Sequence, residues 1–287
     1  MQQTNRSRHR HMTSFQVISL GFLSVIFLGS LLLMLPIATK SGQCTSFLDA
    51  LFTATSAVCV TGLVVNDTAT YWSLFGQGII LLLIQIGGMG IITIAIAIAV
   101  VSGRKIGLMQ RSTMQEAISA PTVGGIVRRT QFIIRTTILI EIIGAALLAP
   151  VFCRDFGFWK GIWYSLFHSI SAFCNAGFDL IGIRTPFSSL TSYSVQPIVN
   201  LVIMALIVAG GIGFLTWEDI KIHKWHFKKY KMQSKVIFMV TGILIFLPAL
   251  YFFYFEFSNV PLTERVWVSL FQSVTPRTAG FNTADFT

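Results

Sequence analysis

The sequence predicts an all-α, polytopic membrane protein built from repeated units of a span, a re-entrant pore helix, a filter loop and a second span. First, 54% of the 287 residues are hydrophobic and only 11% are charged, whereas soluble domains carry roughly a quarter charged residues. Second, the apolar residues form long uninterrupted runs. Third, a short motif ending in glycine recurs between those runs. An ordinary soluble enzyme is excluded.

Five apolar stretches are long enough for a helix to cross a hydrocarbon core about 30 Å thick, which takes about 20 residues. We expect these full spans at 15–38, 72–101, 132–152, 195–217 and 236–257. The first is longer than the core of a signal peptide, and no small-residue cleavage site follows it, so we expect it to be retained. Three shorter stretches suit re-entrant pore helices, at 47–58, 163–173 and 266–275.

The basic residues predict the orientation, because Lys and Arg concentrate in short cytoplasmic loops. Of the 21 Lys and Arg residues, 15 lie in the N-terminal tail, in the loops after the second and fourth spans and, for Arg135, at the cytoplasmic start of the third span. The N-terminus is therefore expected in the cytoplasm, and the pore helices are expected to enter from outside. The net charge of +10 thus marks orientation and contact with membrane lipid, and implies no nucleic acid.

This topology divides the chain into six segments. We expect a cytoplasmic tail (1–13), repeat 1 (14–101), a cytoplasmic loop (102–130), repeat 2 (131–217), a second cytoplasmic loop (218–234), and a repeat 3 truncated after its filter (235–287).

The three short segments are copies of one motif. They read LFTATSAVCVTGL from Leu51, LFHSISAFCNAGF from Leu166 and LFQSVTPRTAGF from Leu270, the third being one residue shorter. Non-helical backbone at membrane depth must be buried in protein or line a watery cavity. Rings of backbone carbonyls there replace the hydration shell of a cation, and glycine permits the backbone angles and close approach that this requires. The repeat therefore predicts a filter.

Glycine-rich segments also recur in the second and fourth spans, as Gly87-Gly88-Met89-Gly90 and Gly210-Gly211-Ile212-Gly213. Two interpretations stay open. Small residues let membrane helices pack closely, or these glycines leave room around an inner gate.

The filter-like stretches CVTGL, CNAGF and TPRTAGF, with GGMG and GGIG between them, resemble the Trk/Ktr/HKT superfamily of potassium transporters. The bacterial Ktr-type membrane subunit is the closest match, because the extra N-terminal helix pair of Trk-type subunits is missing. The resemblance implies a potassium-channel-like fold with four non-identical repeats and potassium uptake across the cell inner membrane. It also implies a homodimer and a cytosolic nucleotide-binding ring that gates it.

Carried over by position, the resemblance assigns potassium-binding carbonyls to nine filter residues: Val60, Thr61, Gly62, Asn175, Ala176, Gly177, Thr278, Ala279 and Gly280. A glycine rather than a serine at position 62 points to potassium over sodium. The sequence ends at Thr287, so the rest of repeat three, its gate and the fourth repeat are expected in a longer subunit.

Single residues leave several interpretations open. Glu141 lies near the membrane midplane, where an acid is an ion-pathway candidate by default, although it has no obvious basic partner and a wet crevice also suits it. Arg277 is expected to brace the filter from behind or to face the outer mouth. Cys59 and Cys174 are expected to pack behind the filter. Cys44 and Cys153 both lie outside, but the sequence does not show whether they pair.

Sequence motifs for nucleotide hydrolysis, acyl transfer and metal binding are absent. We therefore expect no enzyme and no cofactor in this chain, with potassium as the transported substrate and nucleotide bound by the partner. A non-conducting membrane receptor or assembly scaffold is the main alternative. A coupled transporter with broken helices is a third alternative. Inverted repeats would favour it, but the distribution of charges indicates repeats of one orientation. Sodium dependence and the regulatory nucleotide are not determined by the sequence.

Overall fold

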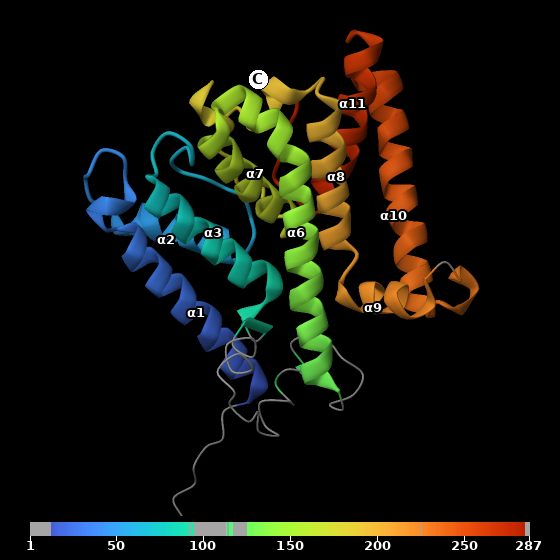
Figure 1. The fold of residues 1–287 in the computed structure, drawn as a ribbon, viewed down its shortest axis with the longest axis horizontal. Coiled ribbons are helices and arrows are strands. Elements are labelled where there is room, and N and C mark those ends of the chain that lie inside the picture. Colours follow the sequence, from blue (N-terminus) through green and yellow to red (C-terminus); the bar gives the residue numbers. More distant parts are fainter. Residues whose placement is uncertain are drawn as a thin grey trace, which may run out of the picture.

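The computed structural model describes residues 13–91, 93–94, 113, 115–116, 125–224 and 226–284. These residues form helices and loops without any strand, apart from an isolated antiparallel bridge between Thr39 and Trp72. Figure 1 shows α6, α8 and α10 running alongside one another, with α1 and α3 inclined at one side. The all-α prediction is confirmed.

Repeat 1 begins with α1 (Ser14–Leu33), whose N-cap Thr13 forms a reciprocal capping box with Gln16. The pore helix α2 (Phe47–Val58) has the predicted bounds. α3 (Leu74–Met89) begins the second span and ends at Gly90. Most of the span expected beyond Gly90, and of the loop expected to follow it, lies outside the described residues.

Repeat 2 begins with α6 (Ile126–Phe156), which has 31 residues and extends beyond the expected span at both ends. Gly157, with a φ of +81°, reverses the chain into the pore helix α7 (Phe158–Phe173). A Cβ on Gly161 would overlap the backbone of Cys153, so this glycine allows α6 and α7 to pack closely.

The fourth expected span, 195–217, is wrong as a single straight helix. α8 (Pro197–Gly211) ends at the glycine pair, and α9 (Phe214–His223) leaves it with a bend of 96°. Gly213 has a φ of +80°, a conformation that only glycine adopts without strain. In Figure 1, α9 accordingly runs across the lower end of the bundle.

Repeat 3 begins with α10 (Met232–Tyr251), which continues as a π-helical turn (Phe252–Glu256). The pore helix α11 (Leu262–Val274) starts four residues earlier than expected and is followed by a 3-10 turn (Thr275–Arg277).

Among the residues that the structure describes, three helices are long and apolar enough to cross a membrane: Phe15–Leu33, Val127–Phe156 and Met232–Glu256. The bent pair α8–α9 makes a fourth if it counts as one span. The predicted second span is described only in part. The number of spans therefore stays a prediction.

The core is formed by side chains of all three repeats. Its largest fully buried side chains are aromatic: Trp72, Phe152, Phe167, Phe178, Phe271 and Phe281. By contrast, α1 and α10 expose many large apolar side chains, such as Phe27 and Phe246. Such exposed apolar faces suit contact with lipid tails.

Candidate functional site

The first two pore helices end in the same cap. Val60 and Asn175 occupy the left-handed region, with φ of +57° and +60°, although neither is glycine. Each occupies the left-handed position of a Schellman motif. In this motif an amide past the helix end donates to a carbonyl of the last turn: the Thr61 amide to the Ser56 carbonyl at 2.8 Å, and the Ala176 amide to the Ser171 carbonyl at 2.7 Å. These caps turn the chain sharply from each helix into its filter stretch.

The third pore helix ends differently. After α11 the 3-10 turn Thr275–Arg277 takes the place of the left-handed residue, and Thr278 has a φ of −156°. Pro276 is the second residue of that turn, within the first turn of a helix where proline is tolerated. The different cap accounts for the third copy being one residue shorter.

The three filter glycines meet, although they are separated by 115 and 103 residues in the sequence. A Cβ on Gly62 would overlap the carbonyl oxygen of Ala176, and one on Gly177 would lie 2.5 Å from the Gly280 Cα. A Cβ on Gly280 would lie 3.5 Å from the Gly177 Cα and 3.6 Å from the Gly62 Cα. The three backbones are therefore in direct contact, and the arrangement is closed at the glycines.

Other predicted filter residues hold the copies together. Thr278 Oγ1 donates to Asn175 Oδ1 at 3.0 Å, which joins the filters of repeats 2 and 3. The Ala279 carbonyl accepts from Thr275 Oγ1 at 3.1 Å, so in this structure that oxygen faces its own pore helix.

Hydroxyl groups at equivalent positions of repeats 2 and 3 brace the residue after each glycine. Ser171 Oγ donates to the Phe178 carbonyl, and Thr275 Oγ1 donates to the Phe281 carbonyl, both at 2.7 Å. The equivalent hydroxyl of repeat 1, Ser56 Oγ, is buried without a hydrogen-bond partner among the described residues.

His168 supports the same region from one turn further back. Its Nδ1 lies 2.7 Å from the Tyr164 carbonyl, and its Nε2 lies 3.3 Å from the Leu180 amide nitrogen. Because a carbonyl needs a donor and an amide needs an acceptor, these contacts assign a neutral imidazole protonated at Nδ1. The sequence alone does not single out His168 as a site residue, although it lies within the second copy of the repeated motif.

The first glycine of each glycine-rich segment packs on the pore helix of its own repeat. A Cβ on Gly87 would overlap the carbonyl oxygen of Val58, the last residue of α2. A Cβ on Gly210 would overlap the carbonyl oxygen of Phe173, the last residue of α7. The helix-packing interpretation therefore holds for these two glycines.

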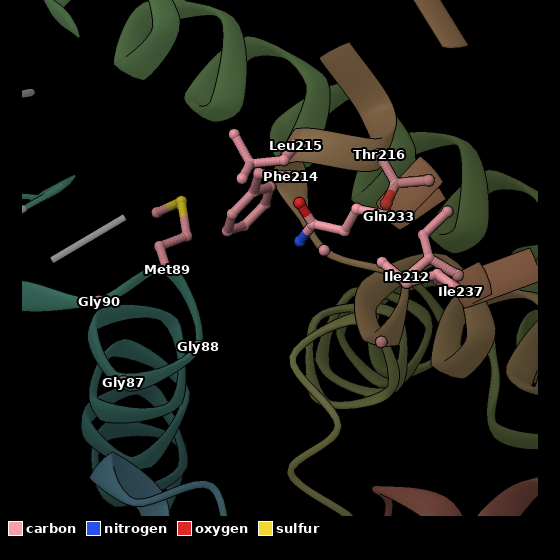
Figure 2. Close-up of a pocket in the computed structure, with 12 residues that line it drawn as sticks. Gly87, Gly88, Met89, Gly90, Ile212, Phe214, Leu215, Thr216, Gln233 and Ile237 are labelled. Carbon is pink, nitrogen blue, oxygen red and sulfur yellow. The ribbon is translucent and has the colours of Figure 1, made fainter. Parts of the chain in front are cut away.

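All glycines of these segments except Gly210 line a cavity of about 510 Å³ beside the filter. A Cβ on Gly211 would lie 3.7 Å from Thr278 Oγ1. Figure 2 shows Met89 at the end of α3 and, on the opposite side, Phe214 and Leu215 at the start of α9. The lining comprises Gly87, Gly88, Met89, Gly90, Gly211, Ile212, Gly213, Phe214, Leu215, Thr216, Gln233 and Ile237. The glycines thus also leave room next to the filter.

Glu141 is buried and contacts repeat 1. Gln85 Nε2 on α3 donates to both carboxylate oxygens, at 3.0 and 3.2 Å, and Ser169 Oγ donates to the Glu141 carbonyl at 2.7 Å. Glu141 does not line the cavity beside the filter. An ion pathway and a wet crevice both stay predictions for Glu141. Its partner is the amide of Gln85, whereas only basic partners were considered from the sequence.

The remaining single residues are placed as follows. Arg277 Nη2 donates to Thr241 Oγ1 on α10 at 3.2 Å, which fits bracing from behind. Cys174 is buried behind the filter as expected, whereas Cys59 is exposed. Cys44 and Cys153 are free thiols in this structure. Within the described part of the chain, no group of His, Cys, Asp or Glu is arranged to hold a metal ion.

Comparisons with known proteins agree with this architecture. The family TrkH, described as "Cation transport protein", matches residues 1–287. The chain is 40% identical over 282 residues to the "Potassium/sodium uptake protein NtpJ" of Enterococcus hirae, covering 96% of this chain and 61% of that protein. It is 43% identical over 277 residues to the "Ktr system potassium uptake protein B" of Bacillus subtilis, covering 94% and 60%.

The chain therefore spans about 60% of the length of these curated relatives. Among solved structures, the potassium transporter TrkH from Vibrio parahaemolyticus matches with a TM-score of 0.67 at 20% identity, over 98% of this chain and 54% of that one. That likeness supports the fold, and the family match covers every residue of the sequence. The family is one of transporters rather than enzymes, and this chain belongs to it: it is a member of the TrkH family of cation transport proteins.

Proposed function

We propose that this chain is the ion-translocating part of a potassium-uptake subunit in the cell membrane. Backbone carbonyls of the three filter stretches select the ion, from Val60, Thr61 and Gly62, from Asn175, Ala176 and Gly177, and from Thr278, Ala279 and Gly280. The Ala279 carbonyl, which accepts from Thr275 Oγ1 in this structure, would turn toward the ion in the conducting form. The observation that carries this proposal is the meeting of Gly62, Gly177 and Gly280 at the ends of three short helices.

Electrostatics support cation passage at this point. α2, α7 and α11 each end just before a filter stretch, so each helix directs the negative end of its dipole at the meeting point. Since the glycine backbones touch in this structure, the conducting form needs the three stretches to stand further apart. The names of the relatives, which refer to potassium and sodium uptake, favour the same class of substrate.

The proposal includes the arrangement predicted from the sequence. The N-terminus lies in the cytoplasm, the subunit forms a homodimer, and a cytosolic nucleotide-binding ring gates the pathway. The basic segments 102–130 and 218–234 offer a cytoplasmic surface for the ring or for anionic lipid.

Rubidium uptake in a potassium-uptake-deficient bacterium tests this function. The full-length subunit, expressed with its cytosolic partner, is expected to restore uptake of radioactive rubidium. A non-conducting receptor or scaffold would restore none, and either that result or an obligatory movement of a second ion would overturn the proposal.

The Gly62→Ser substitution tests the filter. Gly62 has a φ of +81°, and a Cβ there would overlap the Ala176 carbonyl. A left-handed backbone costs other residues about 1–2 kcal/mol, so serine must displace a carbonyl proposed to bind the ion. We expect the ratio of potassium to sodium uptake to fall.

Gly42→Ser is the matched control, because Gly42 also has a positive φ, +71°, but nothing lies within 4 Å of its Cβ position. An unchanged uptake ratio in a folded Gly62→Ser protein, or equal uptake of both ions by the parent protein, would contradict the filter assignment.

A further inference from the structure

A second pocket lies between the start of α6 and α9, away from the filter. It has a volume of about 380 Å³ and is lined by Gly125, Arg128, Arg129, Phe132, Glu218, Lys221 and Ile222. Three of these side chains are cationic and one is anionic. The proposed ion pathway does not use any of them.

The charges in this pocket are only partly satisfied. Arg129 Nε pairs with Glu218 Oε1 at 3.1 Å, which neutralises the only acid in the lining. Arg129 Nη1 is buried and has no hydrogen-bond partner among the residues that the structure describes. A buried guanidinium donor without a partner is costly, so this atom points to an anionic oxygen that is supplied by a ligand.

Two more cations face the same space. The Lys221 ammonium lies 4.3 Å from the centre of the Phe132 ring, which holds it beside the pocket through a cation–π contact. Arg128 is exposed in the lining. With Arg129 paired to Glu218, the pocket keeps an excess of two positive charges.

Helix geometry places the pocket at headgroup depth. Arg128 and Arg129 lie in the first turn of the apolar helix Val127–Phe156, just before the span predicted to begin at residue 132, so we place them at the edge of the hydrocarbon. α9 is bent by 96° from α8 and so runs roughly along the membrane surface. Its Ile222 side chain is 61% exposed and offers an apolar rim beside Phe132, as an acyl chain requires.

We propose that this pocket binds the phosphate of an anionic phospholipid, with Arg128, Arg129 and Lys221 on the headgroup and Phe132 and Ile222 against the start of the acyl chains. Arginine suits a phosphate because its fork of donors matches the phosphate oxygens. The apolar rim distinguishes a lipid from free phosphate.

The site also lies close to the cavity beside the filter. Arg129, Phe132 and Glu218 share a small neighbouring cavity with Phe214 and Leu215, and the last two line the cavity beside the filter. Glu218 is one helical turn beyond Phe214 on α9. A bound lipid would therefore hold α9 in the bent position that shapes the filter cavity.

Lipid binding by the purified protein in neutral detergent tests the proposal by native mass spectrometry, with dioctanoyl phosphatidylglycerol as the probe. Dioctanoyl phosphatidylcholine and inorganic phosphate are the comparison ligands. We expect phosphatidylglycerol to bind best and Arg128→Gln and Lys221→Gln each to weaken it about fivefold, since a basic residue near an anionic lipid contributes about 1 kcal/mol.

Arg129→Lys keeps a cation for Glu218 but removes the unpaired Nη1, and is also expected to weaken binding. Lys229→Gln is the matched control, because it removes the same charge from a residue outside the pocket lining and should leave binding unchanged. Gel filtration and thermal unfolding check that each variant is folded.

Equal affinity of the parent protein and the pocket variants for phosphatidylglycerol would overturn the site. Equal binding of phosphatidylcholine would overturn its preference for anionic lipid, and phosphate binding as tight as that of the lipid would replace the lipid by a soluble anion. Native mass spectrometry measures lipid binding without any ion transport. A failure of the lipid site is therefore distinguishable from a failure of the proposed uptake function.

Discussion

The contact between Gly210 and the end of α7 makes Gly210→Ala the sharpest test of the packing around the filter. A Cβ there would overlap the Phe173 carbonyl oxygen and lie 3.1 Å from Asn175 Nδ2. Both neighbours belong to the cap that turns the chain into the second filter stretch, and a backbone carbonyl at a helix end cannot rotate away as a side chain does. α8 must therefore shift away from α7.

The expected cost follows from two opposing effects. Overpacking of a well-packed site typically costs about 1–3 kcal/mol, while replacing glycine by alanine in a helix gains about 1 kcal/mol. We expect a net loss of up to about 2 kcal/mol, toward the upper end because the overlapped atom belongs to the backbone. Gly242→Ala is the control, since Gly242 lies inside α10 with nothing within 4 Å of its Cβ position, and only the gain applies.

Thermal unfolding of the purified variants measures the difference, and rubidium uptake shows whether the filter is disturbed. Gly210→Ala should unfold at a lower temperature than the parent protein, and Gly242→Ala at the same or a higher one. If both variants unfold alike, the contact between α8 and the end of α7 does not limit packing and the reasoning fails.

Two further substitutions test buried polar groups. His168→Phe leaves the Leu180 amide without its acceptor, so we expect a loss of about 1–3 kcal/mol in thermal unfolding, whereas His168→Gln should lose less; equal stability of both would contradict the bracing role. Glu141→Gln keeps an acceptor for Gln85 Nε2, so we expect unchanged stability and unchanged rubidium uptake. Loss of uptake by the folded Glu141→Gln protein would instead place the carboxylate in the ion pathway.

The repeat could be read from the sequence because each pore helix needs the same short apolar segment followed by glycine. The bounds of α2 were predicted correctly for that reason. The break between α8 and α9 was missed because the run from Val195 to Trp217 is apolar on both sides of the glycines. Hydropathy measures transfer into lipid and does not register a backbone angle such as the positive φ of Gly213.

The polar contacts of the site were harder to predict. Gln85 and Glu141 are 56 residues apart, and nothing in the local pattern of either span indicates that the two helices bring them together. The close approach of the three glycines likewise depends on how the repeats pack. The shorter third motif was visible in the sequence, but its cause, a 3-10 turn in place of a left-handed residue, required the structure.

The unequal caps of the three pore helices have a consequence for how such a protein can vary. In a channel assembled from four identical chains, one sequence position supplies the same residue to all four sides of the filter, so a proline near the ion is present in every subunit. Here Pro276 occurs in one copy, while Val60 and Asn175 serve the others. Each wall of the proposed filter is thus encoded separately, so a substitution in one copy is expected to alter one wall and leave the others unchanged.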